Sequence, residues 1–562
     1  MSGTPTSHIE ARSMSSSGSK PGGWRSFPFI IGAATGSSLA SAGIIANLIV
    51  YLIQEFNIKS ITAAQISNVV NGSSNLFPFL AAIIADSFFG SFSVALISSC
   101  VSFLGTVILA LTATITSLRP HPCNNDGSNH QCTPPSVFQY TVLYAGTALA
   151  AIGFGGARFT TATLGANQFD KPEHQANFFN WFFFTWYISS VIAITALVYV
   201  EDNVSWVLGF GVCAVANLIG VVIFLLGYRF YRPDDLKRSA LLDLVRVLVV
   251  AVRKWKSQLS SRKEDYYSVI DHDYDHDGVG PVLPAAATPG KRLRFFNRAA
   301  QITDGDLKSD DGSIEKPWRL CTVQQVEDFK TVIGILPLWS SSIFLGTPIG
   351  ILSSLTILQA LAMDRSLGPH FKIPAGSTPV IALLSTSIFL TLLDRVLWPG
   401  WQKLTGKSPT PLQQIGVGHV FNVLALVVSA LVESKRLKIA HKHQLQVQHD
   451  PTVNMSVLWL FPQLVLMGIG EAFHFPAQVT FYYQQLPQSL RSTSTAMISM
   501  LVGIAFYLST ALIDQVRRVT DWLPDDINHG KLDIFYWMLV LLGGINFGYY
   551  LLSSTLYKHE NV

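Results

Sequence analysis

The sequence predicts an all-α membrane protein with twelve transmembrane helices in two six-helix lobes, joined by a long central loop that contains an amphipathic helix. Three observations lead to this fold class. Of the 562 residues, 49% are hydrophobic and only 13% are charged, whereas soluble domains average about 25% charged residues. Twelve apolar runs are long enough to cross a bilayer. A polar stretch separates the sixth run from the seventh.

The apolar runs define the expected spans, because each reaches the roughly 20 residues that cross the hydrocarbon core of a bilayer. The expected spans are 28–53, 66–87, 92–115, 138–163, 179–200, 206–228, 329–360, 378–398, 411–432, 454–476, 492–514 and 534–556. Six spans, a polar loop and six more spans form the layout of a two-lobed transporter whose site lies between the lobes, near the membrane midplane.

The domain boundaries follow from these spans. Residues 1–26 are rich in Ser and Gly and lack the apolar core of a signal peptide, so they are expected to form a disordered, uncleaved tail. The first lobe is expected at 27–228, the central loop at 229–327, the second lobe at 328–557 and a short tail at 558–562. The central loop is rich in Lys and Arg, which collect on the cytosolic side of membrane proteins. This predicts a multi-pass protein with both termini in the cytosol, in the plasma membrane or alternatively the vacuolar membrane.

One connector disagrees with this orientation. Glu433–His443 is basic, yet the order of the spans places it on the outer side. The assignment above is kept because short loops and early helices dominate orientation.

The central loop is expected to contain one amphipathic helix. Asp234–Gln258 carries apolar residues at helical spacing among basic ones. Its apolar residues, Leu241, Leu242 and Val249 among them, should pack against the lobes or the membrane surface. Residues 271–312 are expected to be mobile. The acidic opening of that stretch lacks the glutamate that a calcium loop requires at its twelfth position, so no metal site is predicted there.

One full charge lies inside the expected fourth span. Arg158 is surrounded in sequence by Gly, Ala and Phe, and Gly153, Gly155 and Gly156 should let another helix approach closely. An arginine near the bilayer centre costs at least about 2.5 to 3.5 kcal/mol on insertion scales, so a cavity or a partner must compensate it. Arg158 is therefore a candidate binding residue, and a buried arginine paired to hold helices together is the alternative.

Other classes of function are disfavoured by what the sequence lacks. A net charge of +4 is too small to indicate a nucleic-acid binder. No zinc-protease motif, phosphate loop or nucleophile elbow is present, so neither an enzyme nor a cofactor is predicted. Cys123 and Cys132 lie in a loop expected on the outer side. An oxidising compartment would permit a disulfide between them, and two free thiols are the alternative.

Two pairs of adjacent opposite charges end expected spans. Asp364–Arg365 follows the seventh span on the outer side, and Asp394–Arg395 ends the eighth on the inner side. Exposed pairs contribute about 0–1 kcal/mol, so any role of these pairs is expected to be conformational.

Motifs along nearly the whole chain carry a resemblance to a known family. These motifs are AGIIANLIVYL, ADSFFG, LGANQFD, NFFNWFFF, ILPLW, QALAMDRSLG, TPLQQIGVGHV, GIGEAFHFPAQVTFYYQQLP and LRSTSTA. The chain resembles the plant nitrate/peptide transporter family, which is the proton-coupled oligopeptide-transporter branch of the major facilitator superfamily. The resemblance implies that superfamily's fold and a transport function.

The sequence departs from this family at its charged motif. Members normally carry ExxE[RK] in the first span, but the corresponding positions here are Ala34, Ser37 and Ser38. The fourth-span position usually occupied by Lys is Arg158, while the tenth-span glutamate is kept as Glu471. Loss of the first-span motif resembles the nitrate-excretion subgroup of the family, whose members move nitrate out of cells and whose relatives handle chloride.

The chemistry of these positions favours an anion. Arg cannot deprotonate in a protein and offers a planar fork of donors, which suits a planar oxyanion such as nitrate. Chloride would be attracted by the same charge without using the fork. Ser37 and Ser38 add hydroxyl donors for the anion. Glu471 is predicted to pair with Arg158 across the lobes, as a contact that breaks during transport and provides proton linkage. A permanent structural ion pair is the alternative.

The leading prediction is therefore an alternating-access carrier for nitrate or a similar small anion in the lipid bilayer, directed toward efflux. A carrier for chloride, or for a larger organic anion or hormone, is the alternative within transport. A non-transporting receptor or scaffold that uses the basic central loop is the alternative of another class. A scaffold, however, has no need for charges at mid-membrane depth. The sequence does not determine the oligomeric state.

Overall fold

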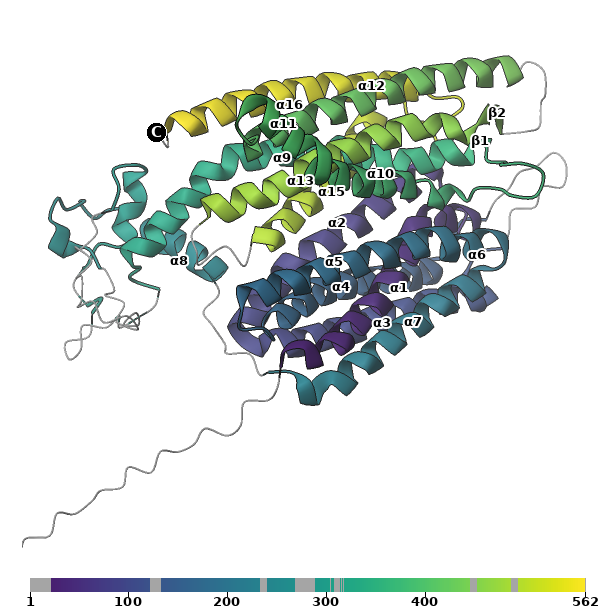
Figure 1. The fold of residues 1–562 in the computed structure, drawn as a ribbon. Helices are drawn as coiled ribbons and strands as arrows, with labels where there is room; N and C mark the ends of the chain where they lie inside the picture. Colours follow the sequence, from purple (N-terminus) through teal and green to yellow (C-terminus); the bar gives the residue numbers. More distant parts are fainter. Residues whose placement is uncertain are drawn as a thin grey trace, which may run out of the picture.

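A computed structural model gives the fold. It describes residues 22–121, 133–232, 240–267, 289–303, 305–307, 314, 316, 318–444, 452–486 and 494–560. Long helices dominate this part of the chain and form two bundles that lie one above the other in Figure 1. The predicted fold class, all-α with twelve spanning helices in two lobes, is confirmed.

The N-terminal lobe holds the first six spans. Its elements are α1 (Phe27–Gln54), α2 (Ser60–Ile84), η2 (Ala85–Phe89), α3 (Gly90–Thr114), α4 (Val137–Ala166), α5 (Pro172–Ile192), η4 (Ala193–Leu197), α6 (Val198–Asn203) and α7 (Trp206–Leu226). α5, η4 and α6 follow one another without a break and together form the fifth span.

The C-terminal lobe holds the other six spans. Its elements are α9 (Val323–Leu361), β1 (Met363–Asp364), η8 (Ala375–Ser377), α10 (Val380–Leu392), η9 (Leu393–Leu397), α11 (Trp398–Thr405), α12 (Pro411–Gln444), β2 (Val453–Ser456), α13 (Phe461–Gln485), α15 (Ser494–Val519) and α16 (Leu532–Glu560). α10, η9 and α11 form the eighth span. The short strands β1 and β2 pair in parallel and mark one end of the molecule.

Eleven helical stretches of the described chain are apolar and long enough to span a membrane, and one of them contains two helices. Residues 60–114 run through both α2 and α3, 55 residues in all, which at 1.5 Å per residue far exceeds the thickness of a bilayer. Gly90, the first residue of α3, has φ +75°, a conformation that favours glycine. The chain turns there, which gives twelve spans.

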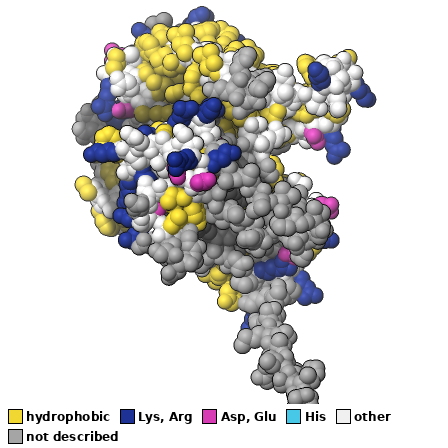
Figure 2. All heavy atoms as spheres, turned by 90° about the vertical axis from the view of Figure 1, so that its left-hand side faces the viewer, with side chains coloured by type: hydrophobic (Ala, Val, Ile, Leu, Met, Phe, Trp, Pro, Cys, Tyr) yellow, Lys and Arg dark blue, Asp and Glu magenta, His cyan; other side chains and the backbone are white. Residues whose placement is uncertain are grey.

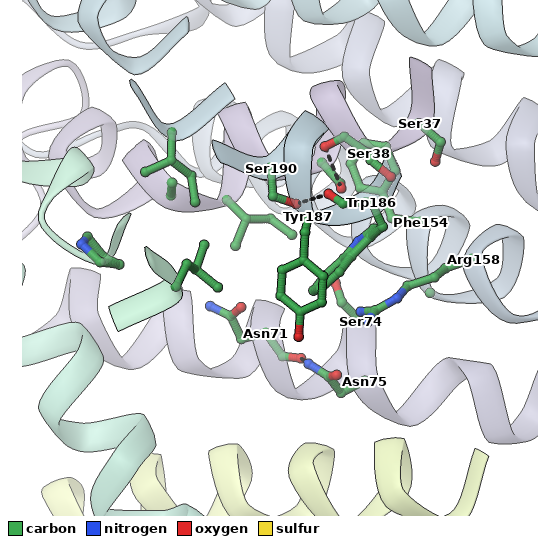
Figure 3. A pocket seen from close by; sticks show the side chains of 18 of the residues that line it. Ser37, Ser38, Asn71, Ser74, Asn75, Phe154, Arg158, Trp186, Tyr187 and Ser190 are labelled. Carbon is green, nitrogen blue, oxygen red and sulfur yellow. Dashed lines mark hydrogen bonds between the residues drawn. The ribbon is translucent and has the colours of Figure 1, made fainter. Parts of the chain in front are cut away.

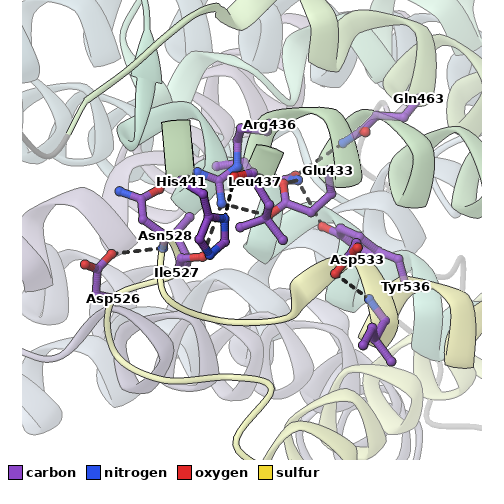
Figure 4. A network of polar contacts seen from close by, with 12 residues as sticks. Glu433, Arg436, Leu437, His441, Gln463, Asp526, Ile527, Asn528, Asp533 and Tyr536 are labelled. Atoms are coloured by element: carbon purple, nitrogen blue, oxygen red, sulfur yellow. Dashed lines mark hydrogen bonds and ion pairs between the residues drawn. The ribbon is translucent and has the colours of Figure 1, made fainter. Parts of the chain in front are cut away.

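The ninth span is longer than predicted. The sequence places its end at 432, but α12 continues to Gln444 and takes in the basic connector. Glu433 and Arg436 lie on this extension and form a fully buried ion pair of 2.7 Å. Arg436 also donates to Asn528 (Figure 4). The prediction was wrong because a carboxylate and a guanidinium one helical turn apart neutralise each other, so the helix can stay inside the protein.

The two lobes contact each other along α2 and α15. A Cβ atom on Gly503 would lie 2.9 Å from the carbonyl oxygen of Gly72, so the two backbones touch at small residues. Beside them, the hydroxyls of Ser73 and Tyr507 are 2.7 Å apart. We call the end of the molecule with β1 and β2 the strand face and the opposite end, with α8 (Ala240–Arg253), the loop face (Figure 1).

The described part of the central loop forms a small packed module at the loop face. It comprises α8 (Ala240–Arg253), η7 (Arg294–Ala299) and the start of α9. Val247, Val250 and Ala251 of α8 are buried among residues of η7 and α9. The module therefore belongs to the C-terminal lobe.

Within the module, α8 packs with a different face, since Leu242, Val245 and Leu248 are exposed and Val249 is only half-buried. Packing of these exposed residues against the membrane surface stays a prediction. Buried polar contacts fix the other face, because Arg246 donates to the carbonyl oxygen of Leu320 at 2.6 Å.

The stretch predicted to be mobile, 271–312, includes η7, which is part of the packed module. The acidic tract Asp271–Gly278 and the flanking 233–239 of the predicted amphipathic helix lie outside the described residues, as do Cys123 and Cys132.

Candidate substrate site

A cavity of about 540 Å³ lies between the lobes. Its walls come from α1, α2, α3, α4, α5, η4 and α7 of one lobe and from α9, α10, α13 and α15 of the other. Most lining side chains are apolar or carry neutral hydroxyl and amide groups. The cavity has the size of a small-molecule site, for which about 300–1,000 Å³ is usual.

Arg158 projects into this cavity from α4. Three glycines two to five residues before it, Gly153, Gly155 and Gly156, allow the neighbouring helices to come close. A Cβ atom on Gly156 or Gly153 would collide with α3, and one on Gly155 would collide with α2. The close approach predicted from these glycines is confirmed. Arg158 is enclosed by the protein, yet its side chain stays accessible to water from the cavity.

No ion pair or hydrogen bond of Arg158 is found among the residues that the structure describes. Its neighbour is the ring of Trp186, whose centroid is 4.0 Å from the guanidinium carbon. A cation over an indole face is attracted by about 0.5–2 kcal/mol. The stack leaves the N–H groups at the edge of the guanidinium free to bind a ligand.

Ser37 and Ser38 also line the cavity, from α1. Within the described chain, no hydrogen bond joins either hydroxyl to Arg158. Ser38 is buried and Ser37 is half-buried. The structure therefore places the predicted hydroxyls in the same cavity as the cation but not in direct contact with it.

The sequence analysis missed several residues that lie nearer to Arg158. Figure 3 shows the Arg158 guanidinium and the Tyr187 ring pointing toward Ser74 and Asn75 of α2. Ser74 Oγ is buried and has no hydrogen-bond partner in the described structure. Asn71, one turn before Asn75, lines the same wall. The signal was present, because three polar residues recur at helical spacing inside an apolar span.

Glu471 faces the cavity from α13 of the other lobe. It accepts a weak hydrogen bond from Thr386 Oγ1 at 3.4 Å. In the described structure no ion pair joins Glu471 to Arg158. The phenol of Tyr187 interacts electrostatically with both charges. In this conformation, Arg158 and Glu471 share one cavity without neutralising each other directly.

The strand face of the cavity is sealed by contacts between the lobes. Asp202 of α6 and Arg365, just after β1, form an ion pair of 3.2 Å, with side chains only 7% and 10% exposed. Ser377 of η8 donates to the carbonyl oxygen of Ile194 at 2.6 Å. Arg365 was predicted to pair with its neighbour Asp364. Instead, Asp364 accepts from the backbone of Ser366, because adjacent side chains in an extended segment point in opposite directions.

No cluster of three or more metal-ligating side chains occurs in the described part of the chain. Two helix bundles around a cavity between them, with one side sealed, form the architecture of an alternating-access membrane transporter. The chemistry of the cavity is that of a binding site with one unpaired cation, neutral donors and one carboxyl.

Comparison with known proteins agrees with this class. A model described as the POT family matches residues 92–528. Protein NRT1/PTR FAMILY 2.6 of Arabidopsis thaliana is 50% identical over 563 residues, covering 100% of this chain and 98% of the relative. Protein NRT1/PTR FAMILY 2.7 of the same plant is 50% identical, covering 98% and 95%.

The fold also matches solved structures. An auto-inhibited POT family peptide transporter aligns with a TM-score of 0.66 at 17% identity, covering 95% of this chain and 97% of that one. The POT family transporter PepTSo aligns with a TM-score of 0.65 at 18% identity, covering 95% and 98%. The chain is thus a membrane transporter of the two-lobed class. It belongs to the POT family, with NRT1/PTR relatives.

Proposed function

We propose that this protein is an alternating-access carrier for nitrate or a similar small anion, with Arg158 as the principal anion contact. The observation that carries the proposal is the lack of an ion pair at Arg158 in the described structure, together with its access to the cavity. A structural arginine in a membrane interior is normally paired. Trp186 holds the guanidinium by one face, so that two parallel N–H groups at its edge can bind one planar oxyanion.

The surroundings of Arg158 support an anion over a zwitterionic substrate. Ala34, Ser37 and Ser38 line the wall where the family places two carboxylates. Neutral residues there leave the positive potential of Arg158 less compensated. Glu471 would carry any proton linkage, by pairing with Arg158 in another conformation and losing that partner here.

The proposed orientation puts the loop face in the cytosol. Figure 2 shows that face, where Lys and Arg side chains gather over both lobes and the module, as the positive-inside rule requires. An inside-negative potential then pushes an anion outward by about 2.3 kcal/mol per 100 mV. We therefore propose efflux across the plasma membrane as the direction of net flux.

The size of the cavity favours one alternative, a carrier for a larger organic anion. A volume of about 540 Å³ would hold a drug-sized ligand. In that case Arg158 would bind the carboxylate or sulfate group, and the apolar walls would bind the remainder. Competition decides between the two, because a preferred organic anion should inhibit nitrate flux at concentrations well below those at which chloride does.

The decisive experiment is flux of labelled nitrate in proteoliposomes at an imposed voltage. Arg158→Ala should abolish nitrate flux, whereas Arg158→Lys should keep part of it, since the charge survives and the fork does not. Arg518→Ala is a matched control, because it removes an exposed guanidinium that pairs with Asp514 outside the cavity. Wild-type flux in the Ala variant would overturn the proposal. Loss of folding in both variants would support a structural arginine instead.

A further inference from the structure

A second carboxyl lies buried in the N-terminal lobe, outside the cavity. Glu201 of α6 is 1% exposed and packs between α1 and α7 near the strand face. The amide nitrogen of Asn47 donates to its Oε2 at 3.0 Å. The sulfur of Cys213 is 4.0 Å from its Oε1.

In the described chain, no Lys or Arg lies within ion-pair distance of Glu201 to compensate this carboxyl. The next residue, Asp202, is also acidic and is already paired with Arg365. α7 presents only the thiol of Cys213, and α1 presents Asn47, which does not titrate. A carboxylate buried with one neutral donor is costly unless it binds a proton or gains water.

Asn47 connects this carboxyl to the other lobe. Asn47 is itself fully buried, and its Oδ1 has no hydrogen-bond partner in the described structure. It lies against η8 of the C-terminal lobe, since a Cβ atom on Gly376 would be 2.5 Å from this oxygen. Glu201 is thus one side chain behind the surface that must separate when the strand face opens.

We propose that Glu201 is a proton-binding residue and that its protonation favours closure of the strand face. In the closed conformation the carboxyl is dry, and a bound proton removes its charge. The new O–H can donate to Asn47 Oδ1 once the amide has rotated, which satisfies the unpartnered oxygen. In an open conformation η8 withdraws and water reaches Asn47 and Glu201, which favours the carboxylate. Closure and proton binding are therefore linked.

The proton would enter and leave from the strand face only, because the closed conformation seals Glu201 from water. Acidity on that side biases the cycle toward closure without moving a proton across the membrane. This inference goes beyond the proposed function. It rests on alternating access and is independent of which anion is carried.

The test measures closure directly, without substrate. Cys100, Cys123 and Cys132 are first replaced by Ser. Spin labels are then attached at Val137 of α4 and Val519 of α15. These two positions lie at the strand face of different lobes and are 83% and 72% exposed. Double electron–electron resonance in nanodiscs then reports the ratio of closed to open populations. In the wild type this ratio should rise as pH falls, by at most about tenfold per pH unit for one linked proton.

Glu201→Gln keeps the size of the side chain and an acceptor for Asn47 but cannot titrate, so it should stay closed at every pH. Asp202→Asn is the matched control, because it should lower the closed-to-open ratio at every pH and still let that ratio rise as pH falls. A shift like that of the wild type in Glu201→Gln, or its loss in Glu471→Gln, would overturn the proposal. Glu201→Asp should retain the shift. A failure of both Glu201 variants to show wild-type closure at low pH would indicate a structural residue instead.

Discussion

Removing Arg436 should destabilise the C-terminal lobe more than removing Glu433 and Arg436 together. Arg436 is completely buried and donates to both oxygens of Glu433, at 2.7 and 2.8 Å. It also donates to Asn528 Oδ1 at 2.5 Å and to the carbonyl oxygen of Ile527 at 3.3 Å (Figure 4). In Arg436→Met, Glu433 would keep one hydrogen bond, from Gln359 at 2.6 Å.

The magnitude follows from this geometry. Breaking a buried ion pair by removing one partner costs about 3–5 kcal/mol, because the remaining charge is left without compensation. Replacing both charges by apolar residues of similar volume is often neutral or stabilising. We therefore expect the free energy of unfolding of Arg436→Met to fall by about 3–5 kcal/mol and that of Glu433→Met/Arg436→Met to fall by less.

The assay is a double-mutant cycle on the free energy of unfolding in mixed micelles. The coupling energy of the pair is the difference between the double variant and the sum of the two single variants. Arg518→Met is a matched control, because its i,i+4 pair with Asp514 is exposed and should contribute about 0.3–0.5 kcal/mol. The reasoning fails if Arg436→Met loses less than about 1 kcal/mol, or if the single losses add up without coupling.

Three further predictions follow from other parts of the molecule. Trp186→Leu should weaken anion binding by about 2- to 30-fold, because about 0.5–2 kcal/mol of cation–π attraction is lost. Trp186→Phe should have an intermediate effect. Binding isotherms for nitrate measure both affinities. Burial alone would raise the pKa of Asp306, but hydrogen bonds from Lys254 and Thr303 hold that pKa below its usual value. The module should therefore be stable above about pH 4 and should loosen as pH falls through the lowered pKa of Asp306. Limited proteolysis at different pH values measures this loosening. Asp306→Asn should remove the pH dependence. Deleting Asp271–Gly278 should leave nitrate flux unchanged with or without calcium, and a calcium-dependent loss would contradict the sequence-based prediction that this tract binds no metal.

The fold could be predicted because lipid imposes strong rules on sequence. Apolar runs of sufficient length recur twelve times, and only helices satisfy the backbone within them. The site was predicted in part for the same reason. A charge as costly as Arg158 is conspicuous inside an apolar run, and so is Glu471.

What failed was the inference from charge to the end of a span. The fifth span was predicted to end at 200 and the ninth at 432, in each case directly before an acidic residue. Glu201 and Glu433 are in fact the most deeply buried carboxyls described here, at 1% and 0% exposure. Glu201 is accompanied by the neutral amide of Asn47, which lies far away in the sequence. Glu433 is accompanied by the guanidinium of Arg436, one turn along the same helix. Such compensation depends on packing, which composition does not reveal.

The pair between Asp202 and Arg365 tests whether the observed conformation is held by charge. Its side chains come from different lobes and are nearly buried, so removing one partner should cost the closed state about 3–5 kcal/mol. By the relation of tenfold per 1.4 kcal/mol, Arg365→Asp should lower the closed-to-open ratio by about two to three and a half orders of magnitude. Asp202→Arg should do the same.

Combining Asp202→Arg with Arg365→Asp restores opposite charges at the same positions and should recover most of the closed population. The spin-label distance between Val137 and Val519 is the measurement for all three variants. Recovery is expected because the contact of Arg365 with the other lobe is made by two side chains. Its second contact, a long hydrogen bond of 3.5 Å to the carbonyl oxygen of Ile373, lies within its own lobe. A double variant as open as either single one would mean that the local packing around these residues, and not their attraction, closes the strand face.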